Sequence, residues 1–282
     1  SRCCQHNHAQ GWPYFTEHLV LATPDNGVAT AIYAACKATV KVGDGKEITL
    51  HEETNYPFEE AIAFTVSTDE KVAFPFYLRI PSWTQKAEVW VNGKKVSVTP
   101  VAGKYLCINR EWANGDRVEL TLPMSLSMRT WQVNKNSVSV DYGPLTLSLK
   151  IAEKYVEKDS RETAIGDSKW QKGADSKKWP TTEIYPDSPW NYSLVLDKKE
   201  PLKNFKVIRK SWPADNYPFT VASVPLEVKA IGRPVPEWKI DETGLCGVLP
   251  EEDAVKGDKE EITLIPMGAA RLRISAFPNT KE

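Results

Sequence analysis

The pattern of apolar and polar positions predicts one helix near the start of the chain and strands after it. Four positions repeat at the i, i+3, i+4, i+7 spacing of one helix face: Phe15, His18, Leu19 and Ala22. This spacing predicts a helix over residues 8–22. The run 23–27, Thr-Pro-Asp-Asn-Gly, consists of turn formers and is expected to end the helix.

From Val28 onward the pattern is that of short β-strands. They are predicted at residues 31–42, 47–54, 61–67, 74–80, 105–109, 117–122, 137–142, 145–151, 193–196, 261–266 and 270–277. A hairpin is predicted where residues 87–91 alternate, Asn92-Gly93 supplies a turn with positive φ, and residues 95–98 return. The fold class is therefore all-β. Short strands separated by turns are typical of β-sandwiches.

The chain is expected to contain two β-sandwich domains after its N-terminal helix. Pro123 is the predicted boundary, which gives a first sandwich at residues 27–124 and a second at 125–282. The second contains a long polar stretch between Glu153 and Tyr192. A structureless loop of that length is unusual in a compact domain, so the stretch is either functional or held down by its aromatic residues.

Composition excludes several classes of protein. The 282 residues carry a net charge of -1 and show no basic stripe, so nucleic acid is not an expected partner. No apolar run approaches the roughly 20 residues that span a bilayer, so no membrane segment is expected. Three of the five cysteines lie alone in apolar segments and are predicted to be small buried residues: Cys36, Cys107 and Cys246.

The segment Cys3-Cys4-Gln5-His6-Asn7-His8 carries residue types that bind zinc. A thiol beside a metal or a positive charge has a lowered pKa and becomes a nucleophile. Adjacent cysteines do not have the spacing of a structural zinc knuckle. The residues alone leave two alternatives, a metal site and an exposed chain end.

Two adjacent carboxylates, Glu52 and Glu53, have the composition of a glycosidase acid–base pair. Neighbours on a strand point to opposite faces, so the two cannot line one site. A strand end is the preferred interpretation. Trp170, Trp179 and Trp190 form either a sugar-stacking platform or a set of anchors for the polar stretch.

An ordered series of motifs resembles the bacterial β-L-arabinofuranosidase family, glycoside hydrolase family 127 and its relatives. The vicinal pair Cys3-Cys4, followed by Asn7 and a helix, is similar to the family's cysteine motif. Further matching stretches follow in the same order: residues 52–58 (EETNYPF), 79–83 (RIPSW), 89–93 (VWVNG), 142–145 (YGPL), 189–192 (PWNY), 264–268 (LIPMG) and 273–277 (RISAF).

The resemblance implies a fold and a mechanism. Family enzymes have an (α/α)6 barrel followed by two jelly-roll-like β-sandwiches, so residues 1–26 would be the end of that barrel. Cys3 would be the nucleophile and a zinc ligand, and Cys4 a second zinc ligand. The scheme is a retaining one in two steps, through a thioglycosyl intermediate, with zinc as cofactor and a plant-glycan carbohydrate as substrate. His6, Trp170 and Trp179 are candidates for sugar contact.

The resemblance also implies that the machinery is incomplete. The family's third cysteine, its ligand glutamate and its acid/base glutamate would lie before Ser1, in a barrel domain that is missing. Two zinc ligands of four do not hold the metal tightly, so the chain alone is expected to be inactive. Gln5-His6 stands where characterised members often have Pro-Pro, which leaves the exact sugar open.

Two alternatives to an enzyme fragment remain, a carbohydrate-binding module and a purely structural domain. A helix cut from its barrel would also leave Phe15, Leu19 and Leu21 partly exposed or buried against another copy of the chain. Self-association through this end is therefore expected.

Overall fold

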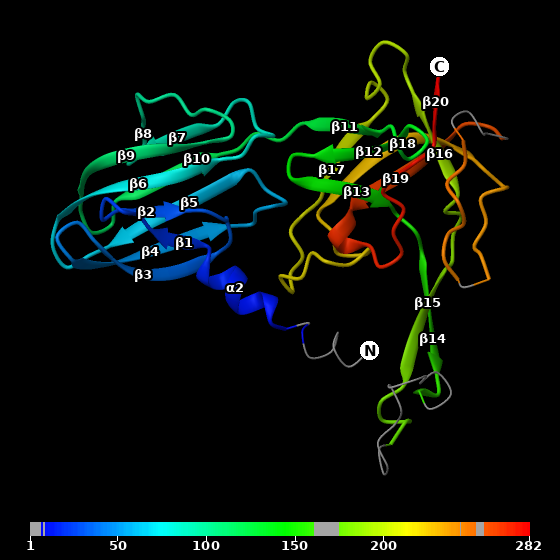
Figure 1. The fold of residues 1–282 in the computed structure, drawn as a ribbon, viewed down its shortest axis with the longest axis horizontal. Coiled ribbons are helices and arrows are strands. Elements are labelled where there is room, and N and C mark those ends of the chain that lie inside the picture. The colour runs from blue at the N-terminus through cyan, green and yellow to red at the C-terminus, as the bar shows by residue number, and fades with distance from the viewer. Residues whose placement is uncertain (1–6, 8, 161–174, 243, 252–256) are drawn as a thin grey trace. The chain divides into compact units, whose positions relative to one another are not determined.

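The computed structural model describes residues 7, 9–160, 175–242, 244–251 and 257–282. The described chain is mostly strand, with one short α-helix, and one of its several sheets curls into a half-barrel. It divides into two compact units, residues 1–125 and 126–282, and Figure 1 shows the strands of each. No helix in the described ranges is long and apolar enough to cross a membrane.

The first unit contains two sheets. The smaller has the order β1 (Val20–Ala22), β2 (Val28–Thr30), β6 (Val72–Ile80) and β9 (Lys104–Trp112). The larger has the order β3 (Cys36–Val42), β4 (Lys46–Thr54), β5 (Ala61–Ser67), β10 (Arg117–Thr121), β7 (Glu88–Val91) and β8 (Lys94–Lys95). Their pairing is antiparallel except between β2 and β6, where Val28 lies opposite Phe76.

The two sheets share one hydrophobic core. Ile62, Phe64 and Val66 alternate with exposed or half-exposed positions on β5, and all three are buried. Phe64 contacts Phe76 of the other sheet edge to face, with ring centroids 5.4 Å apart. Trp112 stacks on Phe74 at 5.7 Å and is completely buried. Period-2 alternation thus directs one face of each sheet inward, as the sequence predicted.

The N-terminal helix is shorter than predicted. Helix α2 covers Gly11–Glu17, and residues 20–22 form β1 instead of a last helical turn. The predicted turn at 23–27 is present, with Asn26 at φ 57°, but it connects β1 to β2 as a hairpin. Pairing with β2 outweighs helical spacing here because the turn brings the two segments into register.

The exposure expected for the side chains at this end is only partly found. Phe15 and Leu21 are exposed, as expected, whereas Leu19 is buried, so the prediction was wrong for Leu19. The amide of Ala31 donates to the carbonyl of Leu19 at 3.0 Å, which places this residue against the first unit. Trp12 and Tyr14 are the most exposed aromatics of α2, and the helix buries none of its residues.

The Asn92-Gly93 hairpin has the predicted geometry. Asn92 has φ 50° and Gly93 has φ 73°, the left-handed pair that a two-residue hairpin requires. Trp90 lies opposite Lys95, and the amide of Val96 donates to the carbonyl of Val89 at 3.0 Å. The returning strand β8 is shorter than predicted and ends at Lys95.

The second unit is built on an eight-stranded sheet. Its main path runs β11 (Leu126–Trp131), β12 (Ser137–Tyr142), β13 (Leu145–Leu149), β19 (Glu260–Pro266), β18 (Leu226–Pro234), β16 (Tyr192–Leu196) and β20 (Asn279–Lys281), and β17 (Lys206–Arg209) pairs with β18. Every residue of β16 is buried, so both faces of this strand are covered. Strands β11, β17, β18 and β20 were not predicted from the sequence.

Residues 270–277 were predicted as a strand and do not form one. They follow a 3-10 turn, η1 (Met267–Ala269), and tie to the sheet by separate hydrogen bonds. Leu149 donates its amide to the carbonyl of Ile274 at 2.9 Å, and Phe277 exchanges bonds with Val138. The segment therefore satisfies its backbone groups outside a continuous ladder.

The polar stretch after Glu153 is partly regular, which corrects the expectation of one long loop. Strands β14 (Glu153–Lys158) and β15 (Thr181–Pro186) pair antiparallel as a two-stranded ribbon. Short polar strands with little hydrophobic alternation gave no clear period in the sequence.

Burial of the lone cysteines was also predicted too strongly, because Cys36 and Cys107 are half-buried and Cys246 is exposed.

Candidate functional site

Most of the residues predicted to carry chemistry lie outside the described part of the chain. These are Cys3, Cys4, His6 and Trp170. Their roles stay predictions. Among the residues that the structure describes, no group of three or more His, Cys, Asp or Glu side chains is arranged to hold a metal ion.

Trp179 is described and lies beside the β14–β15 ribbon. It is 64% exposed, so it does not anchor the polar stretch to a sheet. The amino nitrogen of Lys178 lies 5.9 Å from the centroid of its ring. Trp190 behaves differently, because it packs edge to face on the buried Trp238 at 5.2 Å. Trp190 is thus a structural anchor, and the ring of Trp179 is exposed enough to contact a ligand.

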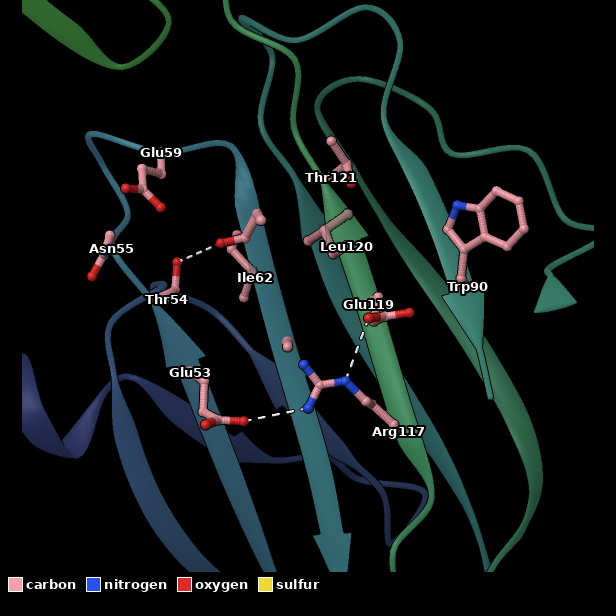
Figure 2. Close-up of a pocket in the computed structure, with 12 residues that line it drawn as sticks. Glu53, Thr54, Asn55, Glu59, Ile62, Trp90, Arg117, Glu119, Leu120 and Thr121 are labelled. Carbon is pink, nitrogen blue, oxygen red and sulfur yellow. Dashed lines mark hydrogen bonds and ion pairs between the residues drawn. The ribbon is translucent and has the colours of Figure 1, made fainter. Parts of the chain in front are cut away.

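A hollow of about 540 Å³ lies on the outer face of the six-stranded sheet. It is lined by side chains of β4, β5, β10 and β7 and by the turn after β4. Figure 2 shows Trp90 at one end of the hollow and Asn55 and Glu59 at the other. Sequence reasoning did not single out this face.

Alternation explains which side chains reach the hollow. Glu53, Ala63, Glu119 and Trp90 lie opposite one another on four neighbouring strands and form one row across the sheet. Since their neighbours along each strand point into the core, these four point outward. Ala61 and Ala63 are outward residues of β5 that lie in the middle of the hollow. Their small side chains form its floor and leave space above it. Two outward alanines between longer polar residues were the available signal.

Charged groups border this floor. The guanidinium of Arg117 places Nη1 3.3 Å from Oε2 of Glu53 and Nε 3.4 Å from Oε1 of Glu119 (Figure 2). All three side chains are about half exposed. Ion pairs at this exposure are screened by water and contribute little to stability. Their groups can therefore exchange partners with a ligand at low cost.

Glu52 and Glu53 point to opposite faces, as predicted. Glu53 is at the hollow, whereas Glu52 is 1% exposed and faces the core between Cys36 and Phe64. Its Oε1 has no hydrogen-bond partner among the residues that the structure describes, and the thiol of Cys36 lies 3.9 Å from Oε2. Burial raises the pKa of the Glu52 carboxyl to about 8, because the apolar surroundings disfavour its charged form. Burial likewise raises the pKa of the Cys36 thiol to about 11.

Comparison with known proteins identifies the class to which this architecture belongs. Residues 27–124 match a family model described as "Beta-L-arabinofuranosidase, GH127 middle domain". The resemblance seen in the sequence motifs is therefore confirmed, because residues 27–124 are similar to a GH127 middle domain. No curated protein matches the sequence.

Solved structures show the same fold over nearly the whole chain. A GH127 beta-L-arabinofuranosidase from Geobacillus stearothermophilus T6 aligns with a TM-score of 0.64 at 21% identity, covering 99% of this chain and 37% of that one. A protein named only as a glycoside hydrolase aligns with a TM-score of 0.64 at 22% identity, over 99% of this chain and 40% of that one. A GH127 beta-arabinofuranosidase aligns with a TM-score of 0.58 at 22% identity, over 92% and 37%. The chain thus spans well under half the length of these relatives.

Proposed function

We propose that the chain is the C-terminal, β-rich part of a retaining glycoside hydrolase that acts on β-L-arabinofuranosides or similar plant-glycan sugars. The observation that carries the proposal is the GH127 middle domain at residues 27–124, which follows the Cys3-Cys4 motif in the order the family would require. Two of the similar structures are named as arabinofuranosidases, which supports the choice of sugar.

The proposed domain organisation is the end of a helical barrel at residues 1–26, a first β-sandwich at 27–124 and a second at 125–282. Both sandwiches would be jelly-roll-like, and they would brace the barrel. The exposure of helix α2 supports the proposal that another domain packs against it, because the helix exposes Trp12, Tyr14 and Phe15 and buries none of its residues. Aromatic side chains gathered on an exposed helix mark a surface that another domain covers.

The proposed chemistry is a double displacement at the sugar's anomeric carbon. The Cys3 thiolate forms a bond to that carbon while the bond to the leaving oxygen breaks, and an acid from another domain protonates that oxygen. Water then attacks the anomeric carbon as the bond to the Cys3 sulfur breaks, and it gives its proton to the base left by that acid. The two inversions together retain the anomeric configuration. Zinc, when bound by Cys3, Cys4 and ligands from elsewhere in the protein, would keep the thiol deprotonated. Because the acid and the remaining zinc ligands would come from elsewhere in the protein, this chain alone would be inactive.

Other residues have smaller proposed roles. His6 would contact the sugar in the intact protein, and replacing it with Ala would then lower activity. Trp170 and Trp179 would contact a longer glycan. The exposure of Trp179 is compatible with this role. Loss of glycan affinity in Trp179→Ala, compared with Trp190→Phe at the structural tryptophan, would support it.

The experiment that tests the proposal uses a protein extended at its N-terminus to the length of the solved relatives. Cys3→Ala and Cys4→Ala are assayed beside the parent on an aryl β-L-arabinofuranoside, and intact mass is recorded after rapid quenching. A glycosyl adduct on the parent that is absent from Cys3→Ala supports the nucleophile. Undiminished turnover in Cys3→Ala contradicts it.

A carbohydrate-binding role without catalysis is the second candidate. The hollow on the outer sheet favours it, since binding there needs neither the cysteine pair nor a barrel. Hydrolysis by the extended protein separates the two candidates, because glycan binding at the hollow can also accompany catalysis.

A further inference from the structure

The hollow owes its depth to the small side chains of one central strand. Ala63 of β5 lies between Glu53 of β4 and Glu119 of β10 on the outward side, and Ala61, the next outward residue of β5, lies opposite Thr121. An exposed central strand typically carries larger β-branched or aromatic residues on such a face. The volume of about 540 Å³ falls within the range of small-molecule sites, roughly 300–1,000 Å³.

The polar groups around the floor are those that recognise hydroxyl groups. Glu53, Glu119 and Arg117 offer paired acceptors and a planar set of donors, which match the two hydroxyls of a vicinal diol. Asn55 and Thr121 add neutral donors and acceptors on either side. Arg117 is about half exposed and weakly held at 3.3 and 3.4 Å, so a ligand can take its place beside either carboxylate.

The charge of the lining selects against anions. Three carboxylates, those of Glu53, Glu59 and Glu119, outnumber the single guanidinium of Arg117. A phosphate or a uronic acid would meet an excess of negative charge. A tightly held metal is not indicated, because the described residues contain no cluster of ligands. A neutral polyhydroxylated molecule is the chemistry that remains.

Trp90 supplies the apolar contact that such a molecule needs. It lies opposite Glu119 at the edge of the hollow and is half-buried (Figure 2). Lys95 lies opposite Trp90 on the neighbouring strand β8, and its amino nitrogen is 5.8 Å from the centroid of the Trp90 ring. The C–H face of a sugar ring is apolar and packs on an indole while its hydroxyls reach the neighbouring polar groups.

We infer that this hollow is a binding site for a neutral oligosaccharide, with Ala61 and Ala63 as its floor and Trp90 as its stacking surface. The ligand class follows from the lining of the hollow, and the preference for arabinose-containing chains rests on the proposed function. The site anchors a glycan to the GH127 middle domain.

The test measures binding by the 282-residue chain with EDTA present, so that no metal contributes. Arabinotriose, cellotriose and trigalacturonate are titrated and followed by calorimetry and by amide chemical shifts. We expect a neutral trisaccharide to bind with a dissociation constant of about 1 mM or below. The anionic trigalacturonate binds at least about tenfold more weakly.

Three variants locate the site. Trp90→Ala is expected to weaken binding about tenfold, because one stacking contact is lost. Ala61→Tyr fills the hollow with a residue that favours strands and is expected to abolish binding. Ala73→Tyr, at an exposed position on β6 of the other sheet, is the matched control and retains binding. Amide spectra verify that each variant is folded. If Trp90→Ala does not fold, the comparison of Ala61→Tyr with Ala73→Tyr decides the outcome.

Two results overturn the inference. One is that neither neutral trisaccharide binds when its concentration is about ten times the expected dissociation constant. The other is equal binding by Ala61→Tyr and Ala73→Tyr. Either can occur while the extended protein still hydrolyses arabinofuranosides, in which case the proposed function stands without this site. Conversely, the chain can bind the trisaccharide while the extended protein is inert on arabinofuranosides. That result supports the site and contradicts the proposed function.

Discussion

The guanidinium of Arg117 on β10 reaches across β5 to the carboxylate of Glu53 on β4, with Nη1 3.3 Å from Oε2. The contact spans a whole strand because the outward side chains of β5 between them are small: Ala63 lies opposite Glu53, and Thr65 lies opposite Arg117. An ion pair that is about half exposed contributes little to stability. The low floor of the hollow and its polar border are therefore not needed for stability, and together they form a surface suited to ligand binding.

Replacing Arg117 with Gln tests whether this ion pair stabilises the fold. We expect the free energy of unfolding of the first unit to fall by no more than about 1 kcal/mol, because water screens the pair. Urea titration followed by circular dichroism measures the change. A loss of several kcal/mol would show that the pair is structural.

The buried carboxyl of Glu52 predicts a stability that depends on pH. Its pKa rises from an ordinary 4.5 to about 8, so the folded chain keeps a proton that the unfolded chain releases between these values. Stability from the neutral carboxyl is complete below pH 4.5 and is lost progressively as the pH rises to about 8. Glu52→Gln removes this loss and should gain stability over the parent as pH increases.

Urea midpoints of the parent and of Glu52→Gln at pH 5 and pH 9 check this prediction. Glu47→Gln, at an exposed position of the same strand, is the control. The difference between parent and Glu52→Gln should be larger at pH 9 than at pH 5, and the control should show no such change. A difference that does not vary with pH would mean that Glu52 is not neutral in the folded state.

Trp112 is expected to be one of the costliest positions to truncate. Its ring is completely buried between Phe74 and Phe76, and its Nε1 donates to the carbonyl of Phe74 at 3.0 Å. Trp112→Ala should destabilise the first unit by roughly 3–5 kcal/mol through lost packing and an unfilled cavity. Trp131→Ala, at a tryptophan 41% exposed in the second unit, should cost much less. Similar thermal shifts for the two variants would contradict the packing described.

Helix α2 should make the chain self-associate. Trp12 is 63% exposed and Tyr14 65%, and no neighbour within the described chain buries them. Analytical ultracentrifugation should show a mass that increases with concentration, and the double variant Trp12→Ser, Phe15→Ser should stay monomeric. The double variant Val98→Ser, Val101→Ser, at exposed apolar positions elsewhere in the first unit, is the control. A parent chain that is monomeric at high concentration would remove the idea.

The sequence predicted elements well where strands alternate and one face enters a core. Ala61–Ser67 and Ser137–Tyr142 have the predicted bounds because their buried positions repeat at period 2 or form a continuous run. The N-terminal helix was overextended because Leu19 fits a helical spacing as well as a strand entry. The β14–β15 ribbon has no fully buried position and so gave no period.

The site was less predictable than the fold. Opposite exposure of Glu52 and Glu53 followed from strand geometry alone. The hollow did not, because its row joins four strands whose register the sequence does not state. The outward alanines Ala61 and Ala63 are visible in the alternation of β5, but they indicate a hollow only once their neighbours across the sheet are known.

The central claim is that this chain supplies part of a zinc-thiolate hydrolase, and one paired measurement tests it most directly. Zinc content and aryl β-L-arabinofuranoside turnover are determined for the chain and for the protein extended to the length of its relatives. The account predicts about one zinc and measurable turnover in the extended protein, with neither in the chain. Zinc retention and hydrolysis by the chain alone, or an extended protein without zinc and without activity, would contradict it.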